Sequence, residues 1–227
     1  MRGGRTLYHA CLSLRDRRAA YLMVASHDDC LSRMNSPLPS LLKEIAACTL
    51  CSGKLPCAPR PVLAASASAR LLIVGQAPGR RVQESGIPWN DASGQRLRQW
   101  LNMSPEVFYD NRQVAIVPMG FCYPGTGRNG DLPPRIECAP AWHARLLAAM
   151  PEIRLTLLIG TYAQKFYLAG RAHPALTDTV AHWRDYLPAY FPLPHPSPRN
   201  TLWLKRNPWF EADIIPALRQ QIERALI

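Results

Sequence analysis

The sequence has only four lysines among its 227 residues, and only 16 acidic residues against 27 lysines and arginines. The shortage of lysine argues mildly against Schiff-base chemistry, which needs an amine nucleophile. The resulting net charge of +11 favours a polyanionic partner, because phosphate contacts release counterions. A merely soluble basic protein is the alternative explanation of the charge taken alone.

Long hydrophobic runs are also missing. No stretch approaches the roughly 18–20 consecutive apolar residues of a transmembrane helix. The N-terminus lacks the short apolar core of a secretory signal. We therefore expect a cytoplasmic protein that acts as a monomer and has no membrane partner. In a reducing compartment, its seven cysteines are expected to be thiols or metal ligands rather than disulfides.

The length of the chain and its 48% hydrophobic content suit one full core, so we expect a single domain with an extension. Residues 1–36 hold six arginines against three aspartates and show little periodicity. They predict a basic N-terminal extension, accessory or disordered, with a targeting segment as the alternative. Residues 37–227 are expected to form the folded domain.

From residue 70 onward, short apolar runs alternate with longer helical patterns, which is typical of parallel sheets covered by helices. The predicted strands are 70–75, 113–119, 155–160 and about 189–193. The predicted helices are 92–102, 137–150, 161–169 and a C-terminal helix that is capped at Asn207 and broken or restarted at Pro216. This order predicts an α/β fold, a three-layer α/β/α domain with a central, mainly parallel four-stranded sheet.

Glycine-rich or polar segments follow three of the predicted strands, at 75–79, 119–122 and 195–200. Ligands of open α/β sheets bind beyond the carboxyl ends of the strands, so these segments should meet at one site. The Gly-Gln-Ala-Pro-Gly turn at 75–79 is weak evidence alone, because such turns serve phosphates and packing alike. It lacks the spacing of dinucleotide and P-loop motifs, which makes a nucleotide-binding protein the less favoured alternative.

Five pieces of sequence follow one another over about residues 40–210. They are Cys48-Thr-Leu-Cys51, the 75–79 turn, Gly86-Ile-Pro-Trp89 with Asp91-Ala-Ser-Gly94, Cys122 with Cys138, and His-Pro-Ser-Pro-Arg-Asn at 195–200. Taken together and in this order, they resemble the uracil-DNA glycosylase superfamily, most closely its bacterial and archaeal iron–sulfur branches. The resemblance implies a monofunctional DNA-repair glycosylase. Such an enzyme flips a deaminated base, first of all uracil, out of damaged DNA and hydrolyses its N-glycosidic bond.

The resemblance also implies roles for single residues. Trp89 would stack on the flipped base, and His195 would hydrogen-bond the base carbonyl and stabilise the departing anion. The base pocket would be bordered by Gly75, Gln76 and Ala77, with Met119 as an apolar wall that could equally be ordinary packing. The residues expected to contact DNA are Arg80, Arg128, Ser197 and Arg199, although the glycine-rich loop around Arg128 could also be a flexible connection.

Cleavage of an N-glycosidic bond builds positive charge on the sugar and negative charge on the base, so it also calls for a carboxylate. Members with an acid just after the Gly-Gln or Gly-Glu pair would need it at Ala77, which has no ionisable group. A branch of the family that lacks this acid has an aspartate two residues before Ser-Gly, in the turn after the stacking aromatic. Asp91 stands at that place in this chain. We predict Asp91 as the catalytic carboxylate, against the alternative that it caps the helix at 92–102, with Glu84 in reserve.

Pro118 stands where the family often has an asparagine that reads the uracil edge, and proline has no side-chain donor. Either another group reads the base, or the preferred lesion is not uracil. A catalytically weak binder of damaged or abasic DNA is therefore the competing hypothesis.

Four of the seven cysteines match the ligand pattern of the iron–sulfur branches. The resemblance implies a [4Fe–4S] cluster held by Cys48, Cys51, Cys122 and Cys138, which would tie the N-terminal segment to the loop at 122–138. Zinc could use the same thiols, and unliganded thiols are the third possibility. Cys57 could replace a ligand, but it is expected, with Cys11 and Cys30, to be a plain thiol.

Overall fold

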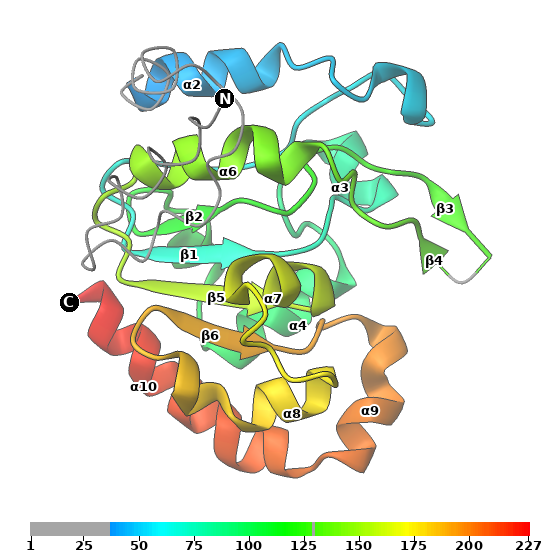
Figure 1. Ribbon diagram of the computed structural model, residues 1–227. Coiled ribbons are helices and arrows are strands. Elements are labelled where there is room, and N and C mark those ends of the chain that lie inside the picture. The colour runs from blue at the N-terminus through cyan, green and yellow to red at the C-terminus, as the bar shows by residue number, and fades with distance from the viewer. Residues whose placement is uncertain (1–36, 129) are drawn as a thin grey trace, which may run out of the picture.

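The computed structural model describes residues 37–128 and 130–227, so the predicted extension at 1–36 lies outside the described residues. A four-stranded sheet with the order β2-β1-β5-β6 forms the centre, and every pairing in it is parallel. Its strands are β1 (Leu71–Val74), β2 (Val114–Ile116), β5 (Leu155–Ile159) and β6 (Tyr190–Leu193). They point the same way in Figure 1, so their carboxyl ends share one edge.

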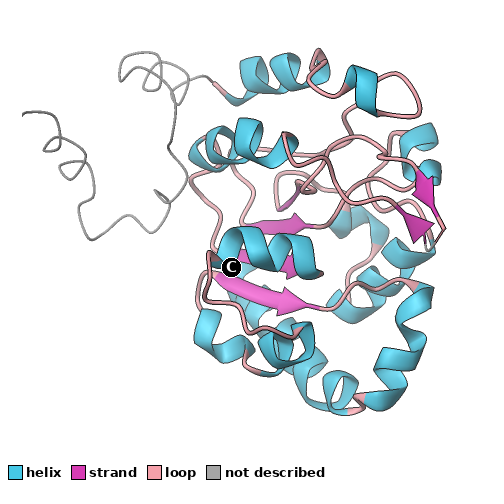
Figure 2. Cartoon of the chain, turned by 45° about the vertical axis from the view of Figure 1, so that its right-hand side comes forward, coloured by secondary structure: helices cyan, strands magenta, loops and turns pink. Residues whose placement is uncertain are grey.

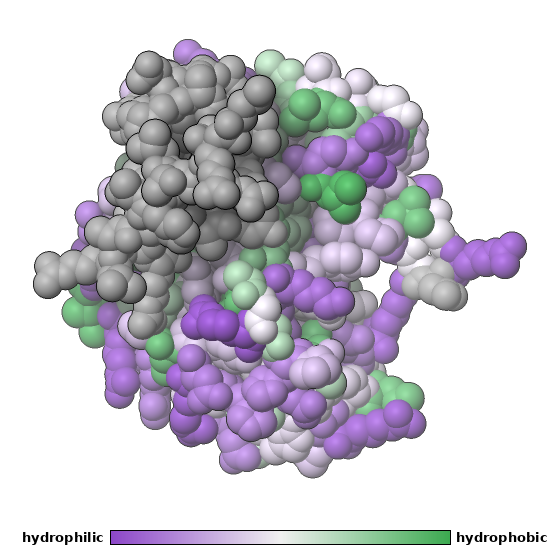
Figure 3. All heavy atoms as spheres, in the orientation of Figure 1, coloured by the Kyte–Doolittle hydropathy of each residue, from purple (hydrophilic) through white to green (hydrophobic). Residues whose placement is uncertain are grey.

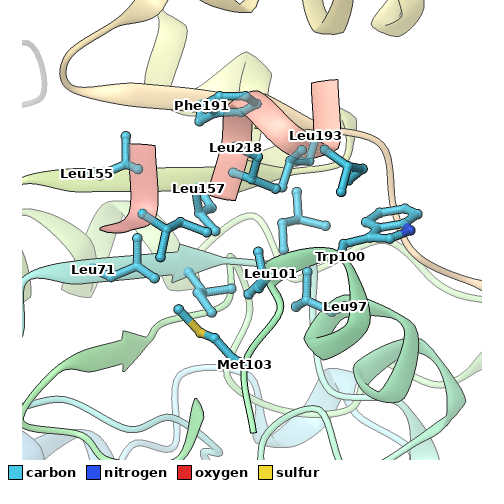
Figure 4. Close-up of a cluster of buried hydrophobic side chains, with 14 of the residues drawn as sticks. Leu71, Leu97, Trp100, Leu101, Met103, Leu155, Leu157, Phe191, Leu193 and Leu218 are labelled. Carbon is cyan, nitrogen blue, oxygen red and sulfur yellow. The ribbon is translucent and has the colours of Figure 1, made fainter. Parts of the chain in front are cut away.

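Helices cover both faces of this sheet (Figures 1 and 2). Because side chains alternate along a strand, Leu71 and Ile73 of β1 enter one hydrophobic cluster, whereas Leu72 and Val74 enter the other. The first cluster, shown in part in Figure 4, is closed by α4 (Ala92–Leu101), α5 (Pro105–Phe108), α8 (Leu176–Ala181) and α10 (Ile215–Leu226). The second is closed by α2 (Leu38–Ala46), α6 (Cys138–Ala148) and α7 (Thr161–Leu168). The predicted three-layer α/β/α fold is confirmed.

Short elements gather near the carboxyl edge of the sheet. They are α3 (Arg80–Ser85), α9 (Thr201–Arg206), the 3₁₀ turn at Pro198–Asn200 and an antiparallel hairpin of β3 (Thr126–Gly127) and β4 (Gly130–Asp131). The hairpin projects from the right of the molecule in Figure 1, and in the space-filling view of Figure 3 hydrophilic residues predominate over the lower half of the face shown. Further 3₁₀ turns lie at Ser52–Lys54 and Trp183–Tyr186. No helix in residues 37–128 and 130–227 has the length and apolarity to cross a bilayer.

The predicted elements are present with shifted ends, and the cap at Asn207 is wrong. Its side-chain amide donates to the Trp203 carbonyl at 2.8 Å, so it closes the preceding helix rather than opening the next. The chain then passes through a π-helical segment, Phe210–Ile214, before α10 begins. Pro216 lies in the first turn of α10, where a missing N–H costs little, so the predicted restart is confirmed.

Candidate active site

A cavity of about 450 Å³ opens at the carboxyl edge of the sheet. Its walls come from the turn after β1, the end of β2 and the loop after β6, together with the segment that leads into α4. Backbone hydrogen bonds join two of these segments. The Met119 N–H donates to the Gly75 carbonyl and the Gly120 N–H donates to the Gln76 carbonyl, both at 2.9 Å. The three segments expected to meet at one site therefore do meet.

Most of the predicted site residues border this cavity. They are Gly75, Gln76, Ala77, Trp89, Asp91, His195, Ser197 and Arg199. Met119 does not, since its buried side chain packs in the hydrophobic cluster on the α2–α6–α7 face and only its backbone supports the pocket. Arg80 and Arg128 are exposed, on α3 and on the hairpin turn, and the reserve carboxylate Glu84 is exposed on α3 outside the cavity wall.

Trp89 lies on the wall between Gly75 and His195. A Cβ at Gly75 would come within 2.7 Å of Cζ2 of the indole, so the ring rests directly on the backbone of the turn. The indole and the His195 imidazole have centroids 5.6 Å apart and planes inclined by 34°. The proximity of the two rings fits an aromatic platform and a hydrogen-bond donor that face the same ligand.

His195 is held in one tautomer. The backbone N–H of Ser197 donates to Nδ1 at 3.2 Å, so in the neutral ring the proton lies on Nε2. The Asn200 amide donates to the His195 carbonyl at 2.8 Å and holds the loop from the other side. Burial lowers the pKa of His195 to about 4, although the charge of Asp91 offsets part of that effect. The ring is therefore neutral near pH 7 and offers Nε2–H as its donor.

Asp91 both caps a helix and borders the cavity. Its Oδ1 accepts the backbone N–H of Gly94 at 2.8 Å and so caps α4. The same residue borders the cavity. Its Oδ2 accepts no hydrogen bond from the residues that the structure describes, so this oxygen remains available to a water or a sugar.

The His195 loop is also tied to α4 by Arg96. Its Nη1 donates to the Ser197 carbonyl at 3.1 Å, between residues that are 101 positions apart in the sequence. A charged donor makes a stronger hydrogen bond than a neutral one, so this contact fixes the loop relative to the helix that Asp91 caps.

Asp131 is a second carboxylate on the cavity wall, and sequence reasoning missed it. The hairpin places it there, with Oδ2 3.3 Å from the position that a Cβ on Gly79 would occupy. The hydroxyl of Thr126 in β3 donates to its Oδ1 at 3.4 Å. The Asn-Gly pair at 129–130 was the available signal, because it favours a tight hairpin turn that brings the following residue back.

A buried histidine behind the cavity was also missed. His143 of α6 is 1% exposed, and its Nε2 lies 3.0 Å from the Pro118 carbonyl. Because a carbonyl can only accept, Nε2 carries the proton, and Nδ1 accepts the Tyr167 hydroxyl at 2.7 Å. Burial lowers the pKa of His143 to about 4. This chain of hydrogen bonds supports the pocket wall at Pro118.

This site geometry lies within a region that matches a known family. The family model of the uracil DNA glycosylase superfamily matches residues 63–219, which include every residue of the cavity wall except Val62. The chain belongs to this superfamily. The Type-4 uracil-DNA glycosylase of Sulfurisphaera tokodaii is 26% identical over 137 residues, which are 57% of this chain and 60% of that protein. The chain thus spans about 60% of the length of that curated relative.

In this superfamily member, four free cysteines surround one region. Cys48, Cys51 and Cys122 are partly buried and Cys138 is buried. Burial raises the pKa of Cys122 to about 11 and of Cys138 to about 12, and the charges of Cys48 and Cys51 add to both effects, which requires these thiols to lie near one another. Cys57 also acts on Cys122, but it is exposed.

Backbone and side-chain donors face these sulfurs. The Phe121 N–H donates to Cys138 Sγ at 3.4 Å, and the Arg135 guanidinium offsets part of the burial effect that raises the pKa of Cys51. In the described part of the chain, no group of three or more His, Cys, Asp or Glu side chains converges as a site for a metal ion. The donor types and their N–H partners nevertheless suit a group bound by four thiolates, because hydrogen bonds to sulfur stabilise the thiolate form.

Proposed function

We propose that this protein is a monofunctional DNA glycosylase that flips a deaminated base, first of all uracil, out of DNA and hydrolyses its N-glycosidic bond. The observation that carries the proposal is the meeting of Trp89, neutral His195 and Asp91 around one cavity at the carboxyl edge of the sheet. Superfamily membership supports it. We expect the protein to act as a monomer on damaged DNA in the cytoplasm.

Trp89 would bind the flipped base by stacking. An aromatic face accepts every base, and such stacking is worth about 1–3 kcal/mol per base. The cavity volume of about 450 Å³ is within the range of small-molecule pockets. The exposed Arg80 and Arg128, with Ser197 and Arg199 on the cavity wall, would contact the DNA backbone around the flipped nucleotide.

His195 would stabilise the leaving base. When the bond between the sugar C1′ and the base nitrogen breaks, its electron pair stays on the base, and Nε2–H would donate to the base oxygen where negative charge gathers. Nδ1 already accepts the Ser197 N–H, so a second proton on the ring would break that hydrogen bond. The loop therefore keeps His195 neutral, with Nε2–H as its donor.

Asp91 would act on the sugar side. Its free Oδ2 would stabilise the positive sugar and accept a proton from the water that adds to C1′. The remaining hydroxide bonds to C1′ as the C1′–N bond breaks, and the proton taken from the water in the end neutralises the base anion, so one water yields a free base and an abasic sugar. No lysine borders the cavity within the described residues, which agrees with hydrolysis rather than Schiff-base chemistry.

For the four-cysteine region, we propose a [4Fe–4S] cluster held by Cys48, Cys51, Cys122 and Cys138. When bound, it would serve as a structural crosslink between the segment before β1 and the loop that precedes α6. Zinc bound by the same four thiolates is the alternative.

A weak binder of damaged or abasic DNA is the second candidate function. Ala77 and Pro118 both border the cavity and offer no side-chain hydrogen bond, at the two places where the resemblance leads one to expect an acid and a base reader. These two positions therefore bear on which base the cavity prefers. Release should be screened with oligonucleotides that contain uracil, hypoxanthine, xanthine or a mismatched thymine.

The deciding experiment measures uracil release from a single-stranded oligonucleotide in single turnover. Asp91→Asn and His195→Ala are each expected to slow release by at least a hundredfold, because each removes one charge-stabilising group. Glu84→Gln is the matched control, since this exposed carboxylate lies outside the cavity wall. Unchanged rates in both site variants would overturn the site assignment. DNA binding without release of any base would favour the weak binder.

A further inference from the structure

The backbone of Trp89 adopts a conformation that a bulky residue avoids. Its φ is +56°, in the left-handed region that favours glycine. Such a conformation persists only where the surroundings enforce it, and it concentrates at functional sites. The neighbours of the Trp89 backbone therefore determine where the indole lies.

Two glycines leave the space that this conformation needs. A Cβ at Gly94 would overlap the carbonyl oxygen of Trp89, so the first turn of α4 admits that carbonyl only because position 94 has no side chain. Gly75 does the same for the indole ring. The glycines permit the conformation, but neither of them attracts the carbonyl.

Arg98 supplies the attraction. It lies on α4 one turn beyond Gly94, and its Nη1 donates to the Trp89 carbonyl at 3.4 Å and to the Tyr109 hydroxyl at 3.1 Å. The guanidinium carbon lies 5.4 Å from the centre of the Phe108 ring and 5.7 Å from that of Tyr109. Phe108 is fully buried in the core, so the charge is anchored to a rigid part of the fold.

We propose that Arg98 is a positioning residue that holds the Trp89 backbone in its left-handed conformation and thereby sets the indole beside His195 before DNA binds. Without the guanidinium, the Trp89 carbonyl loses its charged partner, and the backbone can relax towards an ordinary φ. The ring would then leave its place 5.6 Å from His195. The catalytic consequence rests on the proposed glycosylase function, whereas the structural consequence does not.

The structural part is tested without DNA, by fluorine NMR of the full chain labelled with 5-fluorotryptophan. The six tryptophans give six resonances, and Trp89→Phe identifies the one from Trp89. Arg98→Met is expected to shift and broaden that resonance while the other five keep their positions. Arg112→Met is the control, since this exposed arginine pairs with Asp110 beside α5. An unchanged Trp89 resonance in Arg98→Met would overturn the proposal.

Arg98→Lys covers the case in which Arg98→Met does not fold. Lysine keeps the positive charge but has a single ammonium in place of the planar fork, so the Trp89 resonance should shift less than in Arg98→Met but in the same direction. If the lysine variant folds and its Trp89 resonance matches the wild type, then the guanidinium does not position Trp89 and the proposal fails.

The catalytic part is tested by a double-mutant cycle on base release. Arg98→Met should lower kcat/KM about tenfold to a hundredfold in the wild-type background, because small misplacements of binding groups have effects of this size. It should have almost no further effect in a Trp89→Ala background. Equal losses in both backgrounds would indicate a merely structural role. If the wild-type protein releases no base, the glycosylase proposal fails, while the NMR result on Arg98 still stands.

Discussion

The backbone N–H of Ser197 donates to Nδ1 of His195 across 3.2 Å, and this contact determines which ring nitrogen can serve the substrate. Only two positions separate the residues, so the loop itself sets the tautomer. Nε2–H is left as the donor, on a ring that borders the cavity beside Trp89.

The first prediction concerns the pH dependence of base release. Because burial lowers the pKa of His195 to about 4, the ring stays neutral as the pH rises through the ordinary histidine range. We expect the single-turnover rate to be constant between about pH 5.5 and 8 rather than to change near 6.5. The measurement is a pH–rate profile on uracil DNA. An inflection near pH 6.5 would contradict the neutral-donor role.

The second prediction concerns stability in acid. The folded-state pKa of His143 is about 4, below its unfolded value, so its contribution to stability is complete above about pH 6.5 and is lost as the pH falls towards 4. This group should account for roughly 3 kcal/mol of the loss. His143→Gln should flatten the slope of unfolding free energy against pH in this window, measured by urea unfolding.

The control for that measurement is His182→Gln, because His182 is exposed on the surface. The slope should persist in this variant. A wild-type slope retained in His143→Gln would show that the buried ring is not its source.

The third prediction concerns the contact between Gly75 and the indole. Gly75→Ala would place a methyl group 2.7 Å from Cζ2 of Trp89, so the ring must move. We expect base release to fall by about tenfold or more, with a smaller effect on the melting temperature, because the pocket changes more than the core. Gly53→Ala is the matched control, since a Cβ there meets open space. Wild-type activity in Gly75→Ala would argue against a fixed stacking platform.

The fourth prediction assigns different effects to two arginines that both donate to backbone carbonyls, one on catalysis and the other on stability. Arg96→Met removes the hydrogen bond to Ser197 and frees the His195 loop, so kcat should fall about tenfold while the melting temperature changes little. Arg219→Met removes bonds to the carbonyls of Gln99 and Trp100 at the end of α4 and should lower the melting temperature more than kcat. If kcat and the melting temperature changed in the same way in both variants, the different roles assigned to Arg96 and Arg219 would be contradicted.

The fifth prediction concerns the cysteines. Anaerobically purified protein should be brown and contain iron and acid-labile sulfide, and Cys138→Ser should lose both together with thermal stability. Cys57→Ser should retain them, because Cys57 is exposed and outside the proposed ligand set. Colourless protein that contains zinc would refute the cluster.

Much of the fold could be predicted from the chain because the apolar runs of parallel strands are nearly continuous. Leu71–Val74 and Leu155–Ile159 are buried on both faces, and such runs stand out between helical patterns. The short elements α3, α8 and α9 were not predicted, since six-residue helices carry little periodicity. The prediction that Asn207 caps the following helix was wrong, because its side-chain amide donates instead to the Trp203 carbonyl of the preceding helix.

The sequence by itself determined the order of strands and helices, the turn at 75–79, and the presence of Trp89, Asp91 and His195 in segments that follow or lead into these elements. Local periodicity and turn chemistry are sufficient for that, because each depends on residues close together in the chain. Only the tertiary structure decided that Asp131 and not Glu84 borders the cavity, that His143 supports Pro118, and that Arg98 reaches the carbonyl of Trp89. These outcomes depend on the directions in which side chains point once distant segments pack together, and no local pattern in the sequence encodes those directions.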